Sequence, residues 1–345
     1  MQLQEFIDIH RPIIHRTLKG YLESRIAEPP ATRFSSDSLE RLQPLILSGK
    51  LLRGVMIVML ASFYSEIKPD SGVYKAAAAM ECIQTALLVH DDIIDNDETR
   101  RGMKSTYASY RDTAEEYGYR QAEAYGKSMA ICAGDIAIFL AFDLLSQSAT
   151  SPEHVARIVG LFARETQIVA AGEMLDIDLA ARISEPEVEE IFEMYIYKTA
   201  RYSFSLPFAA GAVLGGADDR TVEELITLGK NIGVLFQMQD DWLGLYGNES
   251  QTGKPVGSDF REHKKTVYRA MLVNTLNKEE RARLDSMHID EFLRLLSERN
   301  VEKKISEIRH CYEQESFDII SRLAYSDKQK DMLREIVHYV VHRNH

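Results

Sequence analysis

The sequence predicts an all-α protein, a single large helical bundle with a central cavity that spans residues 1–345 as one domain. Apolar residues recur at three- and four-residue spacing in most segments, which is the period of amphipathic helices. Runs of β-branched residues with period two are almost absent, and the chain has only nine prolines. No Ser-, Pro- or Gly-rich linker divides the chain, so one bundle is expected rather than two domains.

The apolar pattern places each helix in turn. The expected helices are Leu3–Glu23, Leu52–Tyr64, Gly72–Asp92, Glu116–Ser146, Pro152–Ala180, Glu185–Thr199, Arg201–Leu214, Asp219–Leu245, Thr266–Leu276, Ile289–Glu298, Val301–Ala324 and Asp327–His342. Two charged segments, Asn96–Ser105 and Gly247–His263, interrupt the pattern and are expected to be loops. Each of these loops directly follows a cluster of aspartates.

Composition narrows the classes of function. The formal net charge of −12 disfavours nucleic acid as a partner. The three cysteines are too few and too far apart for a disulfide framework, which favours a reducing, cytoplasmic location. The first residues do not resemble a signal peptide. The apolar stretches Val55–Tyr64 and Ile136–Leu145 are shorter than the roughly 18 residues that a membrane span requires.

The first acidic cluster ends a strongly apolar predicted helix. Asp91 and Asp95 lie one turn apart on one face, and Asp92 lies within the same arc. Like charges this close repel each other unless a cation lies between them, and carboxylate oxygens are ligands that Mg²⁺ prefers. Arg100 and Arg101 follow, and guanidinium groups pair well with phosphate. The alternative is a solvated acidic helix end beside a surface arginine pair.

The second acidic cluster repeats this arrangement. Asp240 and Asp241 end another apolar helix, and the glycine-rich segment after them carries Lys254, followed by Lys264 and Lys265. Glycine allows close approach of the backbone to an anion, and lysine supplies a point charge. Two helices that both end in an aspartate pair followed by basic residues predict a diphosphate site built with Mg²⁺.

Taken together, these motifs resemble the trans-isoprenyl diphosphate synthases, also called the polyprenyl synthetase family. The resemblance runs from about Lys50 to Thr266. It is carried by Gly49-Lys50-Leu51-Leu52-Arg53, Glu81-Cys82-Ile83-Gln84, Asp91-Asp92-Ile93-Ile94-Asp95, Arg100-Arg101-Gly102, Ala133-Gly134-Asp135, Gly172-Glu173 with Asp176, Lys198-Thr199, Phe236-Gln237-Met238-Gln239-Asp240-Asp241, Gly253-Lys254 and Lys264-Lys265-Thr266. Geranylgeranyl diphosphate synthases are the members that the chain resembles most, and the fold implied is the all-α isoprenoid synthase bundle.

The resemblance implies a role for each group of residues. Mg²⁺, as three ions with bound diphosphate, would be held by Asp91, Asp92, Asp95, Asp240 and Asp241. The allylic diphosphate would be bound by Arg100, Lys198, Lys254 and Lys264. Isopentenyl diphosphate would be bound by Lys50, Arg53, Gln84 and Arg101. Lys198, Thr199 and Gln237 would be catalytic, with Thr199 and Gln237 beside the developing allylic cation.

The activity implied is head-to-tail condensation of isopentenyl diphosphate with an allylic diphosphate in a homodimeric enzyme. Gly244 stands where members often have a third aspartate in the second motif, Lys104 where proline is common, and Glu173 where glutamine is frequent. In this family Ala86 and Leu87, just before the first motif, help to set product length. The small Ala86 favours a twenty-carbon product, geranylgeranyl diphosphate.

Three other functions are weighed against this one. Glu307-x-x-His310 and Glu335-x-x-His338 match the spacing of a carboxylate-bridged di-iron bundle, but such a site leaves both aspartate clusters unexplained. A class I terpene cyclase would use the first aspartate motif but would not need a second set of basic residues. A non-catalytic partner subunit is expected to have lost one aspartate motif.

Overall fold

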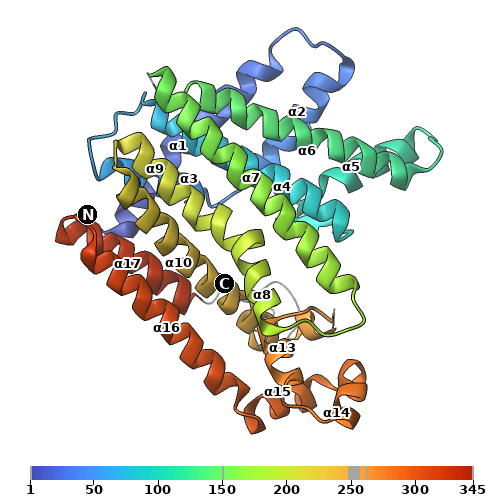
Figure 1. Ribbon diagram of the computed structural model, residues 1–345. Coiled ribbons are helices and arrows are strands. Elements are labelled where there is room, and N and C mark those ends of the chain that lie inside the picture. The colour runs from blue at the N-terminus through green and yellow to red at the C-terminus, as the bar shows by residue number, and fades with distance from the viewer. Residues whose placement is uncertain (1, 150, 248–256, 262, 344–345) are drawn as a thin grey trace. The chain divides into compact units, whose positions relative to one another are not determined.

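The computed structural model describes residues 2–149, 151–247, 257–261 and 263–343 (Figure 1). Within these ranges the chain is helical apart from loops and one two-stranded hairpin, so the prediction of an all-α fold is confirmed. The contacts between residues divide the chain into two compact units. The N-terminal unit comprises Gln4–Leu161 with Ala210–Ala217, and the C-terminal unit comprises Met1–Leu3, Phe162–Ala209 and Asp218–His345. The single domain over residues 1–345 stays a prediction.

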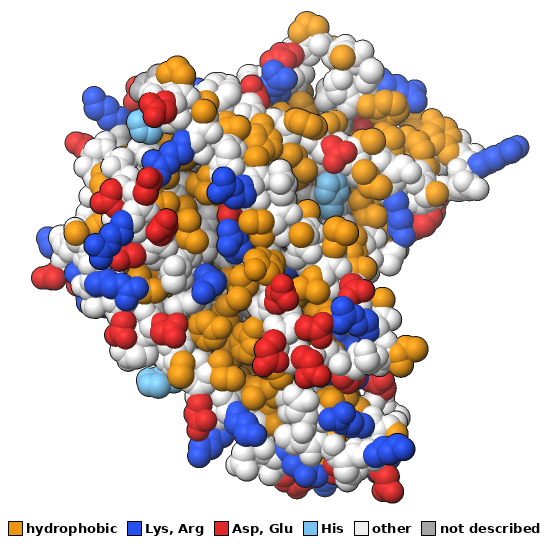
Figure 2. Space-filling view, viewed as in Figure 1, with side chains coloured by type: hydrophobic (Ala, Val, Ile, Leu, Met, Phe, Trp, Pro, Cys, Tyr) orange, Lys and Arg blue, Asp and Glu red, His pale blue; other side chains and the backbone are white. Residues whose placement is uncertain are grey.

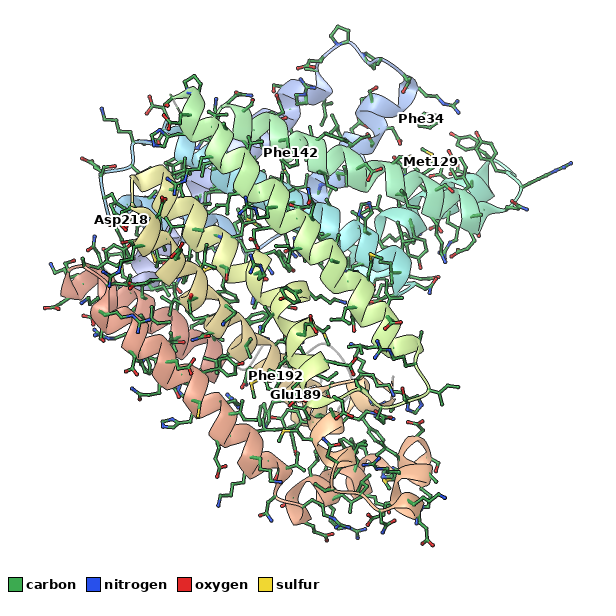
Figure 3. The ribbon with its side chains drawn as sticks, in the orientation of Figure 1. Phe34, Met129, Phe142, Glu189, Phe192 and Asp218 are labelled. Carbon is green, nitrogen blue, oxygen red and sulfur yellow. The ribbon has the colours of Figure 1, made fainter. Side chains whose placement is uncertain are left out.

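The N-terminal unit is built around two long helices that pack against each other, α4 and α6. Its elements are α1 (Leu3–Ile26), α2 (Arg33–Leu47), α3 (Leu52–Ser62), α4 (Gly72–Ile94), β1 (Thr99–Arg100), β2 (Met103–Lys104), α5 (Thr106–Glu116), α6 (Ala122–Ser146) and the start of α7 (Pro152–Ala181). Fully buried alanines, Ala76 to Ala79 and Ala86, line α4 and allow this close packing. Met129 and Phe142 lie on α6 in Figure 3.

The C-terminal unit is organised by α10, which packs against η1 and α16. Its elements after α7 are α8 (Val188–Met194), the π-helix η1 (Tyr195–Ser205), the start of α9 (Leu206–Gly215), α10 (Asp219–Tyr246), α12 (Ser258–Arg261), α13 (Val267–Val273), α14 (Lys278–Arg283), the 3₁₀-helix η2 (Leu284–Ser286), α15 (Ile289–Glu298), α16 (Val301–Arg322) and α17 (Asp327–His342). Helix α16 runs beside α17 (Figure 1), and Phe192 on α8 stacks on Tyr312 of α16.

Local chemistry fixes the elements that later carry the site. Asp218 caps α10, because its carboxylate accepts a hydrogen bond from Thr221 N over 2.7 Å. Gly233 on α10 faces Ala200, and a Cβ at that position would stand only 2.3 Å from Ala200 Cα. The backbones of α10 and η1 therefore approach more closely than any larger residue would allow. This contact sets Lys198 and Thr199 against the helix that carries the second aspartate motif.

Most predicted helices are confirmed, and α15 and α17 have the predicted bounds. The break expected at Ala200 is wrong, because the backbone continues through a π-helix, which keeps the helical path while changing its register. Among the described residues the α-helices α2, α5, α12 and α14 were not expected, and α12 lies within the segment Gly247–His263 that was expected to be a loop. The helix expected to start at Glu116 starts at Ala122, because Gly118 has a positive φ of 66° that ends the preceding helix. Most of the expected loop Gly247–His263 falls outside the described residues.

One described helix, α6, is long and apolar enough to cross a membrane by length and composition alone, with a hydropathy of 1.9. Its apolar run is therefore longer than the stretch Ile136–Leu145 that the sequence singled out. The packed core helix of a globular protein passes the same test, and 44% of the apolar window of α6 is buried within the fold. Figure 2 shows acidic and basic side chains interspersed with apolar ones over the visible face of the molecule.

Candidate active site

The first aspartate motif lies at the end of α4, in the N-terminal unit, and is closed by an arginine. Arg100 Nε donates to Asp92 Oδ1 over 2.6 Å, and Arg100 Nη2 contacts Asp91 Oδ2 at 3.1 Å and Asp97 Oδ2 at 3.2 Å. Asp95 is the C-cap of α4 and is exposed. The structure therefore brings two of the predicted metal ligands, Asp91 and Asp92, together with Arg100, which neutralises part of their mutual repulsion.

The aspartates of this motif differ in exposure. The side chain of Asp92 is only 1% exposed, whereas that of Asp91 is 25% exposed. Burial raises the pKa of Asp92 to about 6, although the charge and hydrogen bond of Arg100 oppose that shift. Its second oxygen, Oδ2, has no hydrogen-bond partner among the described residues. Asp91 and Asp95 are therefore the carboxylates of this motif that a ligand can approach from solvent.

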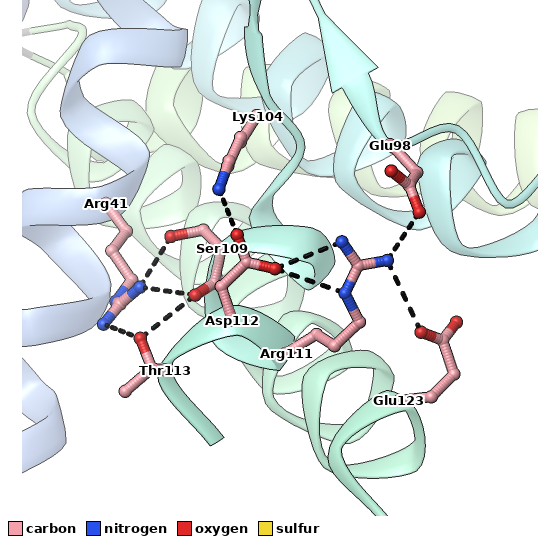
Figure 4. Close-up of polar contacts among 8 residues, drawn as sticks. All are labelled: Arg41, Glu98, Lys104, Ser109, Arg111, Asp112, Thr113 and Glu123. Atoms are coloured by element: carbon pink, nitrogen blue, oxygen red, sulfur yellow. Dashed lines mark hydrogen bonds and ion pairs between the residues drawn. The ribbon is translucent and has the colours of Figure 1, made fainter. Parts of the chain in front are cut away.

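A network of ion pairs holds the hairpin that carries Arg100 and Arg101 (Figure 4). Lys104 of β2 pairs with Asp112 on α5, and Arg111 Nη1 of α5 pairs with Glu98 just before β1 at 2.6 Å. Arg111 also reaches Asp112 at 3.1 Å. Lys104 stands where the family often has proline, and its charge links the hairpin to α5. The network therefore fixes the hairpin that carries both arginines against α5.

The predicted site for isopentenyl diphosphate lies around a buried acid, Glu81. Glu81 Oε1 accepts a hydrogen bond from Gly54 N over 2.8 Å, one residue after Arg53. The pKa of Glu81 is raised above its ordinary value, because the effect of burial exceeds the opposing effects of the hydrogen bond from Gly54 N and of the nearby charges of Arg53 and Arg101. Arg101 Nη1 donates to Leu45 O over 2.9 Å, so the backbone positions the guanidinium.

Lys50 and Gln84 complete this set. Gly49, next to Lys50, lies so close to Arg101 that a Cβ there would stand 3.1 Å from Nη1. The side chain of Lys50 is exposed. Gln84 is buried on α4, and its Oε1 has no hydrogen-bond partner within the described part of the chain. Arg53 and Arg101 therefore form a basic cluster beside the carboxyl of Glu81 in the N-terminal unit.

The residues expected to set product length lie on the same helix. Ala86 is fully buried on α4, and Leu87 is partly buried. Their influence on product length stays a prediction.

Lys198 lies in the C-terminal unit, on η1, between two acids of α7. Its Nζ contacts Glu173 Oε2 at 3.1 Å and also pairs with Asp176. A Cβ on Gly172 would stand 2.4 Å from Lys198 N, so the glycine lets α7 approach η1 at this point. One contact between α7 and η1 therefore brings together four residues that carried the family resemblance, Gly172, Glu173, Asp176 and Lys198.

The second aspartate motif points its two carboxylates in different directions. The side chain of Asp240 is 42% exposed, and that of Asp241 is buried. Asp241 Oδ1 accepts from Gln237 Nε2 over 3.2 Å, and Oδ2 accepts from the hydroxyl of Tyr195. Gln237 Oε1 in turn accepts from Thr199 Oγ1 over 3.0 Å. Thr199 and Gln237, which were predicted to be catalytic, are thus hydrogen-bonded in series with Asp241, which was predicted to bind metal.

Asp240 forms an ion pair with Arg343, which follows α17. The guanidinium of Arg343 lies over the ring of Phe236, 3.7 Å from its centroid. Arg343 O accepts a hydrogen bond from Gln239 Nε2 over 3.0 Å. The chain itself therefore supplies the counter-charge of Asp240, and a metal ion at that carboxylate would have to displace it.

We expect Arg343→Met to lower the magnesium concentration that gives half-maximal activity by about threefold, since a partly exposed ion pair contributes about 0.7 kcal/mol. Methionine keeps an apolar contact with Phe236 and removes the charge. A magnesium titration of activity measures the effect. Arg334→Met is the matched control, because Arg334 pairs with Asp331 on α17 at 2.7 Å, away from the aspartate motif. An unchanged midpoint in Arg343→Met would show that Arg343 does not compete with the metal.

The remaining lysines separate into three cases. Lys254 lies outside the described residues. Lys264 is exposed. The side chain of Lys265 is only 10% exposed, and its Nζ pairs with Glu185 Oε1 at 3.0 Å. Lys264 is thus the lysine of this pair that can reach a ligand.

The chain is similar to known proteins of one family. A model of the polyprenyl synthetase family matches residues 38–307. The chain belongs to the polyprenyl synthetase family. It is 34% identical to the geranylgeranyl diphosphate synthase of Sulfolobus acidocaldarius over 66% of this chain and 63% of that protein, and 31% identical to the synthase of the same name from Saccharolobus solfataricus over 84% and 80%. The first alignment thus spans less than two thirds of the relative.

Solved structures agree with this family. The chain superposes on a geranylgeranyl pyrophosphate synthase of Corynebacterium glutamicum, complexed with isoprenyl diphosphate and magnesium, with a TM-score of 0.85 at 27% identity, covering 99% of this chain and 100% of that one. It superposes on the Pyrococcus horikoshii geranylgeranyl pyrophosphate synthetase with a TM-score of 0.82 at 25% identity, covering 99% and 98%. The resemblance to trans-isoprenyl diphosphate synthases is confirmed, and so is the enzyme class, a trans-prenyltransferase.

The carboxylates suit the Mg²⁺ typical of this family by their chemistry. In the described ranges no group of three or more His, Cys, Asp or Glu side chains stands ready as a closed metal cage. Mg²⁺ keeps several waters and substrate phosphates and needs only one or two carboxylates from the protein. Asp91, Asp95 and Asp240 are hard oxygen donors open to solvent, so they fit such an ion. The number of ions stays a prediction.

Three residues at these sites escaped sequence reasoning as functional candidates. Glu81 was part of the resemblance but had no assigned role, and its position four residues after Ala77 on an otherwise apolar face was the available signal. Tyr195 lies one turn before Lys198, and the other aromatic residues of that segment leave it without a distinguishing sequence signal. Arg343 lies more than 100 residues from Asp240, and no sequence pattern connects the two.

The di-iron alternative is not favoured in this family. Glu335 Oε2 accepts a hydrogen bond from Leu3 N over 2.7 Å, so this carboxylate has a structural partner. The ring of His338 packs against Phe317, with centroids 5.4 Å apart. The spacing Glu-x-x-His on α17 is therefore used in helix packing.

Proposed function

We propose that this trans-prenyltransferase condenses isopentenyl diphosphate head to tail with an allylic diphosphate and makes geranylgeranyl diphosphate. The observation that carries the proposal is the presence of two separate sets of basic residues. In one set Arg53 and Arg101 lie near the carboxyl of Glu81, and in the other Arg100 and Lys198 lie among acids of the motifs. Several relatives bear the name of this synthase, among them proteins from two archaea.

Each basic group then has its own substrate. Arg100, Lys198 and the lysines after the second motif bind the allylic diphosphate, and Lys50, Arg53, Gln84 and Arg101 bind isopentenyl diphosphate. Mg²⁺, when bound with the diphosphate as three ions, draws negative charge from the leaving group. The basic side chains add to this stabilisation as the C–O bond breaks and charge develops on the diphosphate oxygens. Thr199 and Gln237 present oxygen dipoles to the allylic cation.

The double bond of isopentenyl diphosphate attacks the allylic cation and forms the new C–C bond. A proton then leaves the carbon next to the resulting cation, and the released diphosphate accepts it. No side-chain nucleophile is needed. A terpene cyclase would have no use for a second diphosphate site, so the basic cluster around Glu81 favours the transferase.

A product assay tests the proposal. It uses the full chain, MgCl₂, labelled isopentenyl diphosphate and, in separate reactions, dimethylallyl, geranyl and farnesyl diphosphates. Incorporation of label into a twenty-carbon prenyl diphosphate is expected. A cyclic hydrocarbon formed without uptake of label would instead assign a cyclase, and folded protein that turns over no primer would point to a non-catalytic subunit.

Ala86→Phe is expected to shorten the main product from twenty to fifteen carbons. The fully buried Ala86 lies on α4 one and a half turns before Asp91, and a phenyl ring there fills space that a growing chain would occupy. Overpacking costs about 1–3 kcal/mol, so folding is checked by thermal unfolding. Chromatography of the dephosphorylated products measures chain length. Ala86→Ser, which adds little volume, is the control, and an unchanged product distribution in Ala86→Phe would rule out this pocket floor.

We also propose a cytoplasmic homodimer. Helix α6 exposes Ile131 by 47% and Phe139 by 72%, about two turns apart, and it also carries Phe142 (Figure 3). Apolar residues in a row on one helix are typical of a surface that a partner covers. Light scattering should give the mass of a dimer, and Phe139→Glu should shift it toward the monomer. The three cysteines are free, as a reducing compartment requires.

A further inference from the structure

Four side chains and one backbone amide of the C-terminal unit form a continuous series of hydrogen bonds. Thr199 Oγ1 donates to Gln237 Oε1 over 3.0 Å, and Gln237 Nε2 donates to Asp241 Oδ1 over 3.2 Å. Asp241 Oδ2 accepts from the hydroxyl of Tyr195, whose oxygen accepts from Val267 N over 2.9 Å. The two branches of the series therefore meet at Asp241, one at each carboxylate oxygen.

The direction of these bonds fixes the amide of Gln237. A carboxylate offers only acceptors, so Gln237 must turn its NH₂ group toward Asp241. Its carbonyl oxygen then lies on the side of Thr199, where it accepts the threonine proton. The opposite orientation would place two acceptors against each other and leave the amide NH₂ facing Thr199. Asp241 therefore decides which end of the amide faces the position expected for the allylic cation.

Asp241 is poorly placed to bind a metal ion. Its residue is 4% exposed, and both carboxylate oxygens already accept hydrogen bonds from protein donors. Adjacent residues of an α-helix point about 100° apart, so Asp240 and Asp241 cannot share one direction. Asp240 is the outward-facing member of the pair, with 42% of its side chain exposed.

Tyr195 links three segments at one hydroxyl. It belongs to η1, which carries Lys198 and Thr199, it donates to Asp241 on α10, and it accepts from the first residue of α13. Lys264 lies just before α13. Loss of this one oxygen would remove the hydrogen bonds that η1 makes here to α10 and to α13, and would leave the longer bond from Val267 N to Asp241 Oδ2, 3.4 Å, between α13 and α10.

We propose that Tyr195 and Asp241 are positioning residues that orient Gln237 and Thr199. This inference rests on the proposed function and revises the expectation that Asp241 is a metal ligand. The buried hydroxyl and the buried carboxylate act together, so they form one positioning unit.

The first experiment measures binding without turnover. The full chain is unfolded thermally with and without MgCl₂ and inorganic diphosphate, and the rise in Tm is compared among variants. Tyr195→Phe and Asp241→Asn are expected to keep at least about half of the wild-type rise, whereas Asp240→Asn loses most of it, since a bound ligand stabilises the fold by an amount that grows with the logarithm of its affinity. If Asp241→Asn loses the rise as fully as Asp240→Asn does, Asp241 is a ligand and the proposal fails.

The second experiment measures kinetics. Tyr195→Phe and Asp241→Asn are each expected to lower kcat about tenfold while both KM values stay within about threefold, because the interaction lost acts in the transition state. The double variant should be no slower than the slower single variant, since the two residues act as one unit. Strict additivity of the two losses would overturn the proposal.

Tyr246→Phe is the matched control. Tyr246 also lies in the C-terminal unit and donates its hydroxyl proton to a carboxylate, that of Glu302, but it touches neither Gln237 nor Asp241 in any described contact. Its kcat should stay that of the wild type. A Tyr195→Phe variant with the same unchanged kcat would sink the proposal. If the wild type makes no product yet gains Tm with magnesium and diphosphate, the proposed function fails, and the first experiment still decides the role of Asp241.

Discussion

Asp91→Asn is expected to lower kcat by about 10³-fold, because it removes a charged oxygen that helps to hold metal against the leaving diphosphate. The substitution keeps the size of the side chain and one hydrogen-bond acceptor, so folding should be little affected. The magnesium requirement should rise at the same time, since one hard ligand is lost. Steady-state kinetics over a magnesium titration measure both effects.

Asp97→Asn is the matched control for this variant. Asp91 and Asp97 contact the same atom, Arg100 Nη2, at 3.1 and 3.2 Å, but only Asp91 belongs to the aspartate motif. Each substitution therefore removes one ion pair of Arg100, and only one removes a proposed ligand. We expect Asp97→Asn to keep kcat within about threefold, as is usual for a partly exposed pair. Equal losses in both variants would assign the effect to displacement of Arg100.

The sequence predicted the fold well because the apolar period of its helices is strong. The starts of α15 and α17 could be predicted, since a polar N-cap such as Ser326 stands just before an amphipathic run. The π-helix could not, because its register depends on how η1 packs against α10 through Gly233 and Ala200. That contact joins residues far apart in the sequence, and no local propensity encodes it.

The candidate site was predictable for residues within short motifs and not for residues that complete them from elsewhere. Asp91, Asp92 and Arg100 lie within ten residues of one another, and the structure brings them into contact. Arg343 and Tyr195 reach the second motif only through tertiary packing. Exposure was equally hidden from the sequence, since Asp240 and Asp241 are the same residue type in adjacent positions and only one is buried.

Arg101→Met is expected to raise the KM for isopentenyl diphosphate by about 100-fold with kcat changed little, since a guanidinium–phosphate contact contributes about 2–3 kcal/mol to binding in ground and transition states alike. Methionine keeps the apolar stem, and the KM for the allylic substrate should stay unchanged because Arg101 lies in the basic cluster around Glu81. Initial rates with each substrate varied in turn measure both constants.

The control for Arg101 is Arg41→Met, in the same unit. Arg101 Nη1 donates to Leu45 O, and Arg41 Nη1 donates to Ser109 O over 3.2 Å, so each substitution removes an arginine that is held by a backbone carbonyl. At about 1 kcal/mol per lost hydrogen bond, the structural cost should be at least as large in Arg41→Met, since Arg41 also bonds Asp37, Ser109 Oγ and Thr113. Only Arg101→Met should change KM, because Arg41 lies over the ring of Tyr110 and pairs with Asp37, away from Glu81. A rise in the allylic KM instead would exchange the substrates assigned to the two basic groups, while equal rises in both variants would trace the effect to general loosening of the N-terminal unit.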